Sequence, residues 1–280
     1  MNLALAAIKN AIWIGWEMES NWTKKWIYFI YAAVRPMALC LILYFLYMTK
    51  EASPATDENF VAMYIGNAFF NIFIAVAGGI SWVIIQDREH FRIIRYIYVA
   101  PSPFWVYIVG RATIVLAISL VSLAIVMAVG ILFLGIPIGP SNVDFGLLFV
   151  STFLGLVSAT CVGLIFAGVC LITARHSMLM AEGAGAVFLL TCGILYPVDI
   201  MPWFAKILGY ALPMTYWIEL VRRAFGAASF SPALAGYGTT PMLIFLAVLS
   251  VIFTWIALRT FRACEDSAKR SGKLDQTTNY

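Results

Sequence analysis

The sequence predicts an all-α protein with six transmembrane helices, and three observations carry this prediction. Hydrophobic residues make up 62% of the 280 residues, whereas charged residues make up only 11%. Ordinary soluble domains hold about 45–50% apolar and about 25% charged residues. The mean hydropathy is +0.91, and the apolar residues form long runs. This composition excludes a secreted disulfide scaffold, a disordered chain and a soluble enzyme.

Six apolar runs are each long enough to cross a hydrocarbon layer of ~30 Å, which takes roughly 20 helical residues. They are 27–48, 60–85, 105–134, 145–173, 178–196 and 241–261. A further apolar stretch, 197–225, is interrupted by prolines and by the charged residues Asp199, Glu219 and Arg222. Broken segments of this kind favour short re-entrant or interfacial helices over a span. We therefore expect outer re-entrant helices before the last span.

The distribution of charge predicts the orientation. With both ends of the chain in the cytoplasm, most of the 18 Lys and Arg residues lie on the cytoplasmic side. The opposite loop, 49–59, instead carries the acidic residues Glu51, Asp57 and Glu58. Positive charge is enriched in cytoplasmic loops of membrane proteins. The sequence therefore favours an N-in, C-in topology.

The two ends of the chain differ in character. Residues 1–22 predict an interfacial amphipathic helix, because apolar residues recur at spacings of three and four: Leu5, Ile8, Ile12 and Trp16. The alternative is that this segment begins a long first helix. The tail, 263–280, is polar, and we expect it to be cytoplasmic and disordered. Residues 1–262 then form a single transmembrane domain.

The predicted cytoplasmic loop 86–104 combines two stripes at helical spacing. The basic stripe is Arg88, Arg92 and Arg95, and the apolar stripe is Phe91, Ile94 and Tyr98. Asp87 and Glu89 suit a helix N-terminus, and prolines follow at the end of the loop. We expect a short amphipathic helix here. Its pattern fits docking on a soluble partner and anchoring on lipid headgroups equally well.

Polar side chains inside predicted spans are candidate substrate-path residues, because their burial in a bilayer is costly. Tyr64, Asn67 and Asn71 share one face of the second span. The fifth span contributes four more candidates: Glu182, Phe188, Thr191 and Tyr196. Contacts with neighbouring helices explain the two asparagines equally well. In the fourth span, small residues four apart predict close helix packing: Gly155, Ala159, Gly163 and Ala167.

Several kinds of site are not indicated. The sequence has no GxxxxGK[ST] nucleotide loop, no HExxH zinc helix and no GxSxG elbow. His90 and His176 lie in separate loops, and neither has other potential metal ligands at a suitable spacing. We expect no catalytic residue, no metal and no nucleic-acid partner. The sequence also lacks a repeated filter motif or two matching halves, which channels and many secondary transporters show.

A series of motifs covers nearly the whole chain in a characteristic order. After the amphipathic start come Val34-Arg35-Pro36, then Asp87-Arg88-Glu89 with Ala100-Pro101, the block Gly193–Pro202, and finally Leu212-Pro213-Met214-Thr215-Tyr216 with Arg222-Arg223. In this order and spacing they resemble the permease subunits of type-2 ABC exporters. That family includes the daunorubicin-resistance, nodulation-factor and polysaccharide-export permeases.

The resemblance implies partners and roles. Two permease copies, identical or homologous, would join two cytoplasmic ATPase subunits, which bind ATP and Mg, so this chain would hold no cofactor. The 86–104 segment would be the coupling helix on the ATPase, and its contact residues would be Asp87, Arg88, Glu89, His90, Arg92, Arg95 and Tyr96. Residues 1–22 would be the connecting helix. The second and fifth spans would face a path at the dimer interface, capped by 197–225.

The expected function is therefore ATP-driven export across the cell inner (plasma) membrane. The expected substrate is an amphiphilic small molecule or lipid taken from the cytoplasm or inner leaflet. Two alternatives remain open at this point. One is export of a lipid-linked glycan or polysaccharide by the same machinery, and the other is a non-transporting membrane assembly protein.

Overall fold

The computed structural model describes residues 3–20, 25–49, 57–99, 104–139, 142–173, 177–227 and 229–272. These parts of the chain contain helices and turns, and no strand. The long elements are α1 (Leu3–Ser20), α2 (Lys25–Met48), α3 (Glu58–Ile85), α5 (Phe104–Leu132), α6 (Phe145–Ile172), α7 (Ser177–Thr191) and α11 (Thr239–Arg270). The short ones are η2 (Gln86–His90), α4 (Ile94–Val99), η4 (Val198–Ile200), α8 (Trp203–Ala211), α9 (Pro213–Ala224) and α10 (Pro232–Ala235). The all-α prediction is confirmed.

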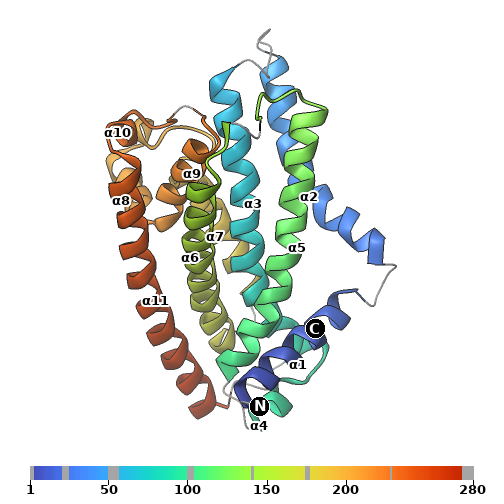
Figure 1. The fold of residues 1–280 in the computed structure, drawn as a ribbon. Helices are drawn as coiled ribbons and strands as arrows, with labels where there is room; N and C mark the ends of the chain where they lie inside the picture. Colours follow the sequence, from blue (N-terminus) through green and yellow to red (C-terminus); the bar gives the residue numbers. More distant parts are fainter. Residues whose placement is uncertain are drawn as a thin grey trace.

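Four of the described helices are long and apolar enough to cross a membrane: α3, α5, α6 and α11. They run side by side in Figure 1. The central one is α3, which packs against α2, α5, α6, α7 and α9 and buries Phe69, Phe73 and Ile80. By contrast, most of α11 faces outward. This exposed apolar surface is what a lipid-facing helix requires.

The number of six spans is not confirmed. Among the described residues of α2, Pro36–Met48 form an apolar helix that is shorter than a span, and Figure 1 shows α2 bending along its length. Pro36 lies inside α2, where it removes a backbone hydrogen bond. In turn, α7 has 15 residues and is roughly 22 Å long. It ends at Thr191, earlier than the predicted 196, so Tyr196 lies in the following turn.

Local sequence signals fix where several helices begin. The Asp57 carboxylate caps α3 by accepting a hydrogen bond from the Asn59 N–H at 2.8 Å. The Asp144 carboxylate caps α6 in the same way through the Leu147 N–H at 3.0 Å. Acidic N-caps satisfy amide groups that have no partner in the first helical turn. Pro213 occupies the first position of α9, where a proline loses no hydrogen bond.

The small residues of α6 allow the close packing that their spacing predicts. A Cβ on Gly155 would lie 2.0 Å from the ring of Trp217 in α9, and one on Gly163 would lie 3.0 Å from the Ala77 carbonyl oxygen of α3. On another side of α6, the hydroxyls of Ser158 and Ser250 lie 2.9 Å apart and tie it to α11. A single helix thus packs closely against three neighbours.

One end of the bundle carries the short helices predicted over 197–225. Figure 1 shows α8, α9 and α10 together at the upper end. Nearly all of α9 is buried because it packs against α3, α6 and α11. The prediction of a broken pair of helices is confirmed. In contrast, α8 exposes Trp203, Phe204 and Ile207.

The opposite end holds α1, η2, α4 and the end of α11, as Figure 1 shows. The helix α1 is separate from α2 and lies against α5, where Ala11 meets Gly110. The prediction that the chain is disordered from residue 263 is wrong for its first part, since α11 continues to Arg270. Ala268 is fully buried there, which explains why the polar segment stays helical.

Candidate functional site

A cavity of about 740 Å³ lies between α2, α3, α5 and α7. This is within the range of about 300–1,000 Å³ that is common for small-molecule sites. Its wall is mainly apolar, and no charged residue lines it among the described residues. The polar lining residues are Asn71, Ser81, Ser119 and Ser122.

Small residues keep this space open. Gly78 and Gly79 of α3 and Gly185 and Ala186 of α7 line the cavity. A Cβ on Gly78 would have no atom within 4 Å, whereas one on Gly79 would lie 2.5 Å from Val115. Gly78 therefore faces open space, and Gly79 lets α3 approach α5.

The polar groups of the cavity are mostly hydrogen-bonded within their own helices. The Ser119 hydroxyl donates to the Val115 carbonyl at 2.7 Å, and the Ser81 hydroxyl donates to the Ala77 carbonyl at 3.2 Å. The Asn71 side-chain N–H donates to the Asn67 carbonyl at 2.7 Å. The wall thus offers a ligand apolar contacts and a few neutral hydrogen-bond acceptors, such as the side-chain oxygen of Asn71.

Of the predicted path residues on α3, only Asn71 lines the cavity. Tyr64 is buried against α5, where its hydroxyl donates to the Val126 carbonyl at 2.7 Å. Asn67 is buried toward α2, and its side-chain N–H lies 3.4 Å from the Cys40 sulfur. The structure thus separates the two asparagines into one that packs between helices and one that faces the cavity.

Three predicted path residues on the fifth span, Phe188, Thr191 and Tyr196, are not among the residues that line the cavity. Phe188 is buried with its ring centroid 4.9 Å from that of Phe73. The Thr191 hydroxyl donates to the Val187 carbonyl at 2.8 Å, and the Tyr196 hydroxyl donates to the Leu190 carbonyl at 2.8 Å. The side chain of Glu182 lies outside the described residues.

The segment predicted as a single amphipathic helix after α3 has a different form. The α3 helix continues into the π-helical turn η2, the chain bends at Phe91, and α4 begins at Ile94. Between them, Arg92 has φ +54°, a conformation that is uncommon for a residue with a side chain. The expectation of one basic stripe is therefore wrong, because a break separates Arg88 from Arg95.

Burial divides the predicted contact residues of this segment into two groups. Asp87 is 1% exposed and Arg88 is 2% exposed, and Glu89 forms an ion pair with Arg88 at 3.3 Å. The exposed residues form what we term the α4 face: His90, Phe91, Arg92, Arg95, Tyr96 and Val99. The second group is open to a partner, Glu89 is partly exposed at 28%, and Asp87 and Arg88 are inaccessible.

The buried group belongs to a polar cluster that the sequence did not indicate. We term Gln86, Asp87, Arg88, Tyr107 and Arg111 the Arg111 cluster. The Tyr107 hydroxyl donates to Asp87 at 2.9 Å, and the Arg111 guanidinium lies 3.8 Å from the other Asp87 oxygen. The sequence did contain one indication of a buried polar site, since Arg111 is the only charged residue in the apolar run 105–134.

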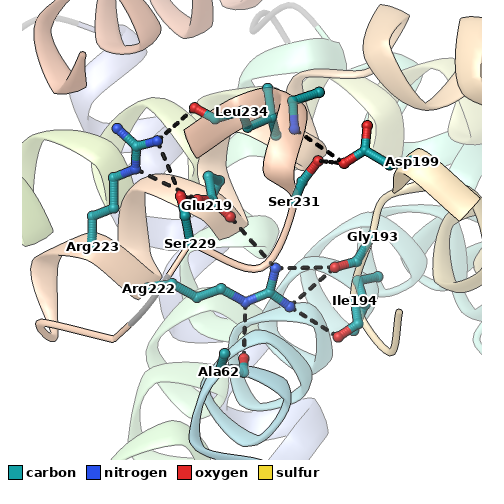
Figure 2. A network of polar contacts seen from close by, with 11 residues as sticks. Ala62, Gly193, Ile194, Asp199, Glu219, Arg222, Arg223, Ser229, Ser231 and Leu234 are labelled. Carbon is teal, nitrogen blue, oxygen red and sulfur yellow. Dashed lines mark hydrogen bonds and ion pairs between the residues drawn. The ribbon is translucent and has the colours of Figure 1, made fainter. Parts of the chain in front are cut away.

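A second buried cluster lies at the opposite end and is shown in Figure 2. We term it the Arg222 cluster: Asp199, Glu219, Arg222, Arg223, Ser229 and Ser231. The Arg222 guanidinium donates to the carbonyls of Ala62 at 2.8 Å, Gly193 at 3.0 Å and Ile194 at 2.9 Å. It thereby ties α9 to the start of α3 and to the turn after α7.

The remaining residues of the Arg222 cluster hold α10 in place. Arg223 donates to the carbonyls of Leu234 and Tyr237, each at 2.7 Å. The Ser231 hydroxyl and the Ala233 N–H donate to Asp199 at 2.5 and 3.2 Å. Burial alone would raise the pKa of Asp199, but these hydrogen bonds, with help from the nearby Lys206 charge, hold it below its usual value of 3.8.

The order of these features along the chain matches a known family of membrane proteins. The family model described as ABC-2 type transporter matches residues 11–226, which run from α1 to just after α9. The chain belongs to the ABC-2 type transporter family. No curated protein matches the chain. The match covers the cavity, the Arg111 cluster and the part of the Arg222 cluster up to Arg223, but it does not include Ser229, Ser231 or α11.

Membership makes the chain a transmembrane permease component of an ABC transporter, and a multi-pass membrane protein. Components of this kind are normally not catalytic, and the family associates with an ABC-type ATPase. Among the residues that the structure describes, no group of three or more His, Cys, Asp or Glu side chains could hold a metal ion. The features to explain are thus a cavity, an exposed face and two buried charge clusters.

Proposed function

We propose that the chain is the permease subunit of an ATP-driven exporter for an amphiphilic small molecule or lipid. The observation that carries the proposal is the cavity of about 740 Å³, with an apolar wall and a few neutral polar groups. An apolar chain or ring system would fill such a wall favourably. A small neutral polar group would use Asn71 or Ser122.

The lining also favours an amphiphile over the alternatives. A polysaccharide carries many hydroxyls, and these would lose hydrogen bonds with water against the apolar wall without replacement. A permanently charged ligand would meet no opposite charge among the described lining residues. A lipid-linked glycan could still place its lipid part here, and a non-transporting assembly protein would have no use for the cavity.

In this proposal the α4 face docks on the ATPase at the cytoplasmic side. Arg92 and Arg95 supply positive charge, and Tyr96 is 70% exposed beside them. Arginine can form charge-assisted, bidentate bonds with carboxylates of a partner. ATP and Mg would bind to that ATPase subunit, and a second permease copy, identical or homologous, would complete the transporter in the cell inner membrane.

Movement of the ATPase would then reach the cavity through the helices. Closing of two ATPase subunits on ATP would displace α4, and the attached helices would tilt. Such a step transports a ligand only if the two states differ in their affinity for it. The cavity wall is made of four helices, so a change in their relative tilt changes its shape and accessibility.

A cavity-filling variant tests this function. We expect Gly78→Leu to reduce the stimulation of ATP hydrolysis by an uncharged fluorescent dialkylglycerol at least tenfold, because the new side chain would occupy the open space. The assay uses the permease with its co-purified ATPase in vesicles of phosphatidylethanolamine and phosphatidylglycerol. Gly183→Leu is the matched control, since a Cβ there also has no atom within 4 Å but does not line the cavity.

The outcomes separate the proposed substrate classes. Loss in Gly78→Leu with an unchanged control supports the amphiphile. Stimulation by a lipid-linked oligosaccharide alone would replace the amphiphile with a glycan. Equal stimulation in both variants would remove the cavity from the transport path.

A further inference from the structure

The segment Gln86–Arg92 contains three features that each cost folding free energy. It forms the π-helical turn η2, a conformation that is rare and frequently found at functional sites. It buries the charged side chains of Asp87 and Arg88, which carries a desolvation penalty. It also holds Arg92 at φ +54°. Such costs persist where the surrounding structure holds them and where they serve a mechanism.

The buried charges connect η2 to three separate helices. On the α5 side, Asp87 accepts the hydrogen bond of Tyr107 at 2.9 Å and faces Arg111 at 3.8 Å. On the α6 side, Arg88 donates to the Cys170 carbonyl at 2.7 Å. That carbonyl belongs to the last turn of α6, where carbonyls lack helical partners and attract positive charge.

Arg111 extends this network to α1. Its guanidinium donates to the Gln86 side-chain oxygen at 3.2 Å and to the sulfur of Met18. The approach is close, since a Cβ on Gly15 would lie 3.2 Å from the Arg111 side chain. The Arg111 cluster therefore contacts α1, α5 and α6 directly behind the exposed segment.

The α4 face projects from the same segment and has its own support. Ile93 N–H donates to the Asp87 carbonyl at 2.9 Å, which links the start of α4 to the buried cluster through the backbone. Tyr98 on the rear of α4 stacks on Phe104 of α5 at 4.5 Å, and Lys269 of α11 lies 5.1 Å above the Tyr98 ring. A push on α4 thus reaches α5 by two routes, one polar and one aromatic.

Stability alone does not account for the buried ion pair. Replacing a buried pair by well-packed neutral residues is often neutral or stabilising, so such a pair is weak evidence for a stabilising role. The 3.8 Å between Arg111 and Asp87 is too long for a direct hydrogen bond. The pair can therefore shorten or lengthen while the surrounding apolar side chains stay packed.

We propose that Asp87, Arg88 and Arg111 are positioning residues that transmit movement of α4 to α5 and α6. This inference rests on the proposed function, because it assumes that an ATPase moves α4. The family resemblance implied that Asp87 and Arg88 belong to the contact surface. The geometry gives them a different task, which is to hold the rear of the segment whose front meets the partner.

The test uses a neutral pair that avoids an unpaired buried charge. In Asp87→Asn with Arg111→Gln, the Tyr107 hydrogen bond can be kept, and both charges are removed together. The α4 face is unchanged, so the co-purified ATPase should stay at the wild-type level. A Ser119→Cys reporter on α5 in the cavity then measures transmission, as the ratio of N-ethylmaleimide labelling rates with and without ATP and vanadate. Labelling of chains without the reporter is subtracted.

The parent is the protein that carries Ser119→Cys as its single substitution. We expect ATP and vanadate to change its labelling rate at least threefold. In the neutral pair with the same reporter, the change should stay within 1.3-fold. Ser158→Ala with Ser250→Ala is the matched control, since it also removes a buried polar contact between helices, and its ratio should equal the parent's. An ATP-dependent change of parental size in the neutral pair, with ATPase bound, would overturn the inference. Absence of any co-purified ATPase from the parent would instead contradict the proposed function.

Discussion

Two buried arginines lie at opposite ends of the bundle, and their bonding differs. Arg222 donates to three backbone carbonyls at 2.8–3.0 Å and stacks over Phe230 at 4.7 Å. Arg111 instead contacts side chains: the Met18 sulfur, the Gln86 oxygen at 3.2 Å and the Asp87 carboxylate at 3.8 Å. Main-chain carbonyls in helices and tight turns cannot rotate independently of the backbone, whereas side chains can rearrange. The comparison indicates a rigid Arg222 end and an adjustable Arg111 end.

Loss of Arg222 should produce the largest effect. Arg222→Gln would remove the charged donor of the Ala62, Gly193 and Ile194 carbonyls. It would also remove one of the two ion pairs of Glu219, the one at 3.8 Å, and leave the pair with Arg223 at 3.5 Å. Breaking a buried charge pair costs about 3–5 kcal/mol. We expect a large loss of folded protein, measured as monodisperse yield and Tm in detergent. Arg223→Gln is the control, because Arg223 is partly exposed, and its Tm should fall much less. Equal Tm values for the two variants would contradict a rigid Arg222 end.

A packing variant tests the same end without changing charge. A Cβ in Gly155→Ala would lie 2.0 Å from the fully buried Trp217 ring of α9. Overpacking of this kind costs about 1–3 kcal/mol. Gly183→Ala meets nothing within 4 Å and should keep or slightly raise the Tm, because alanine favours helix by about 1 kcal/mol. A Gly155→Ala protein as stable as Gly183→Ala would show that α9 can shift away from α6.

Double variants sharpen the comparison between the two arginines. Asp87→Asn should lower the Tm because it leaves Arg111 charged and buried, and adding Arg111→Gln should restore most of the loss. Adding Glu219→Gln to Arg222→Gln should restore little, since the unpaired carbonyls remain. The measurement is the Tm of all four proteins in one detergent. If the second substitution restored the Tm at both ends, or at neither, the Arg111 and Arg222 ends would not differ in the way proposed.

The sequence predicted the helices but not the partners of the buried charges. Apolar runs define α3, α5, α6 and α11 because length and hydropathy are local properties of the chain. The stretch 197–225 is also broken into short helices, as its prolines predicted, because Pro202 and Pro213 lie at the starts of α8 and α9. The α7 helix ends at Thr191, before the end of its apolar run, and Gly193 follows with φ +69°. This turn provides the carbonyls for Arg222, which no spacing rule could show.

The same limit applies to the candidate site. Helical spacing placed Arg88, Arg92 and Arg95 on one face, but the π-turn and the bend at Phe91 break that register. Tyr107 and Arg111 are distant in sequence from Asp87, so only the packing of α5 on α3 brings them together. Spacing along α3 grouped Asn67 with Asn71. Asn67 contacts Cys40 because of how α2 packs on α3. Residue spacing along α3 cannot predict that packing.

The smallest predicted effect concerns pH. The pKa of Asp199 is held below 3.8 in the folded protein, so its contribution to stability is present above that value and disappears as the pH falls through the lower folded pKa. Asp199→Asn should lower stability slightly at neutral pH, because the neutral amide lacks the charge that the hydrogen bonds of Ser231, Ala233 and Tyr210 stabilise. The Tm difference between wild type and variant should shrink as the pH falls below 3.8 and should vanish once the pH is below the folded pKa of Asp199. A difference that persists there would assign the effect to packing of α10.

Co-purification from native membranes tests most directly whether the α4 face binds an ABC-type ATPase. The account predicts that an ABC-type ATPase co-purifies in a stoichiometric amount with the wild-type chain and with the neutral Asp87→Asn, Arg111→Gln pair. It also predicts at least a tenfold loss of that ATPase with Arg95→Glu and Tyr96→Ala on the α4 face, at unchanged permease yield. No ATPase with the wild-type chain, or an undiminished amount with the α4-face variant, would contradict the account.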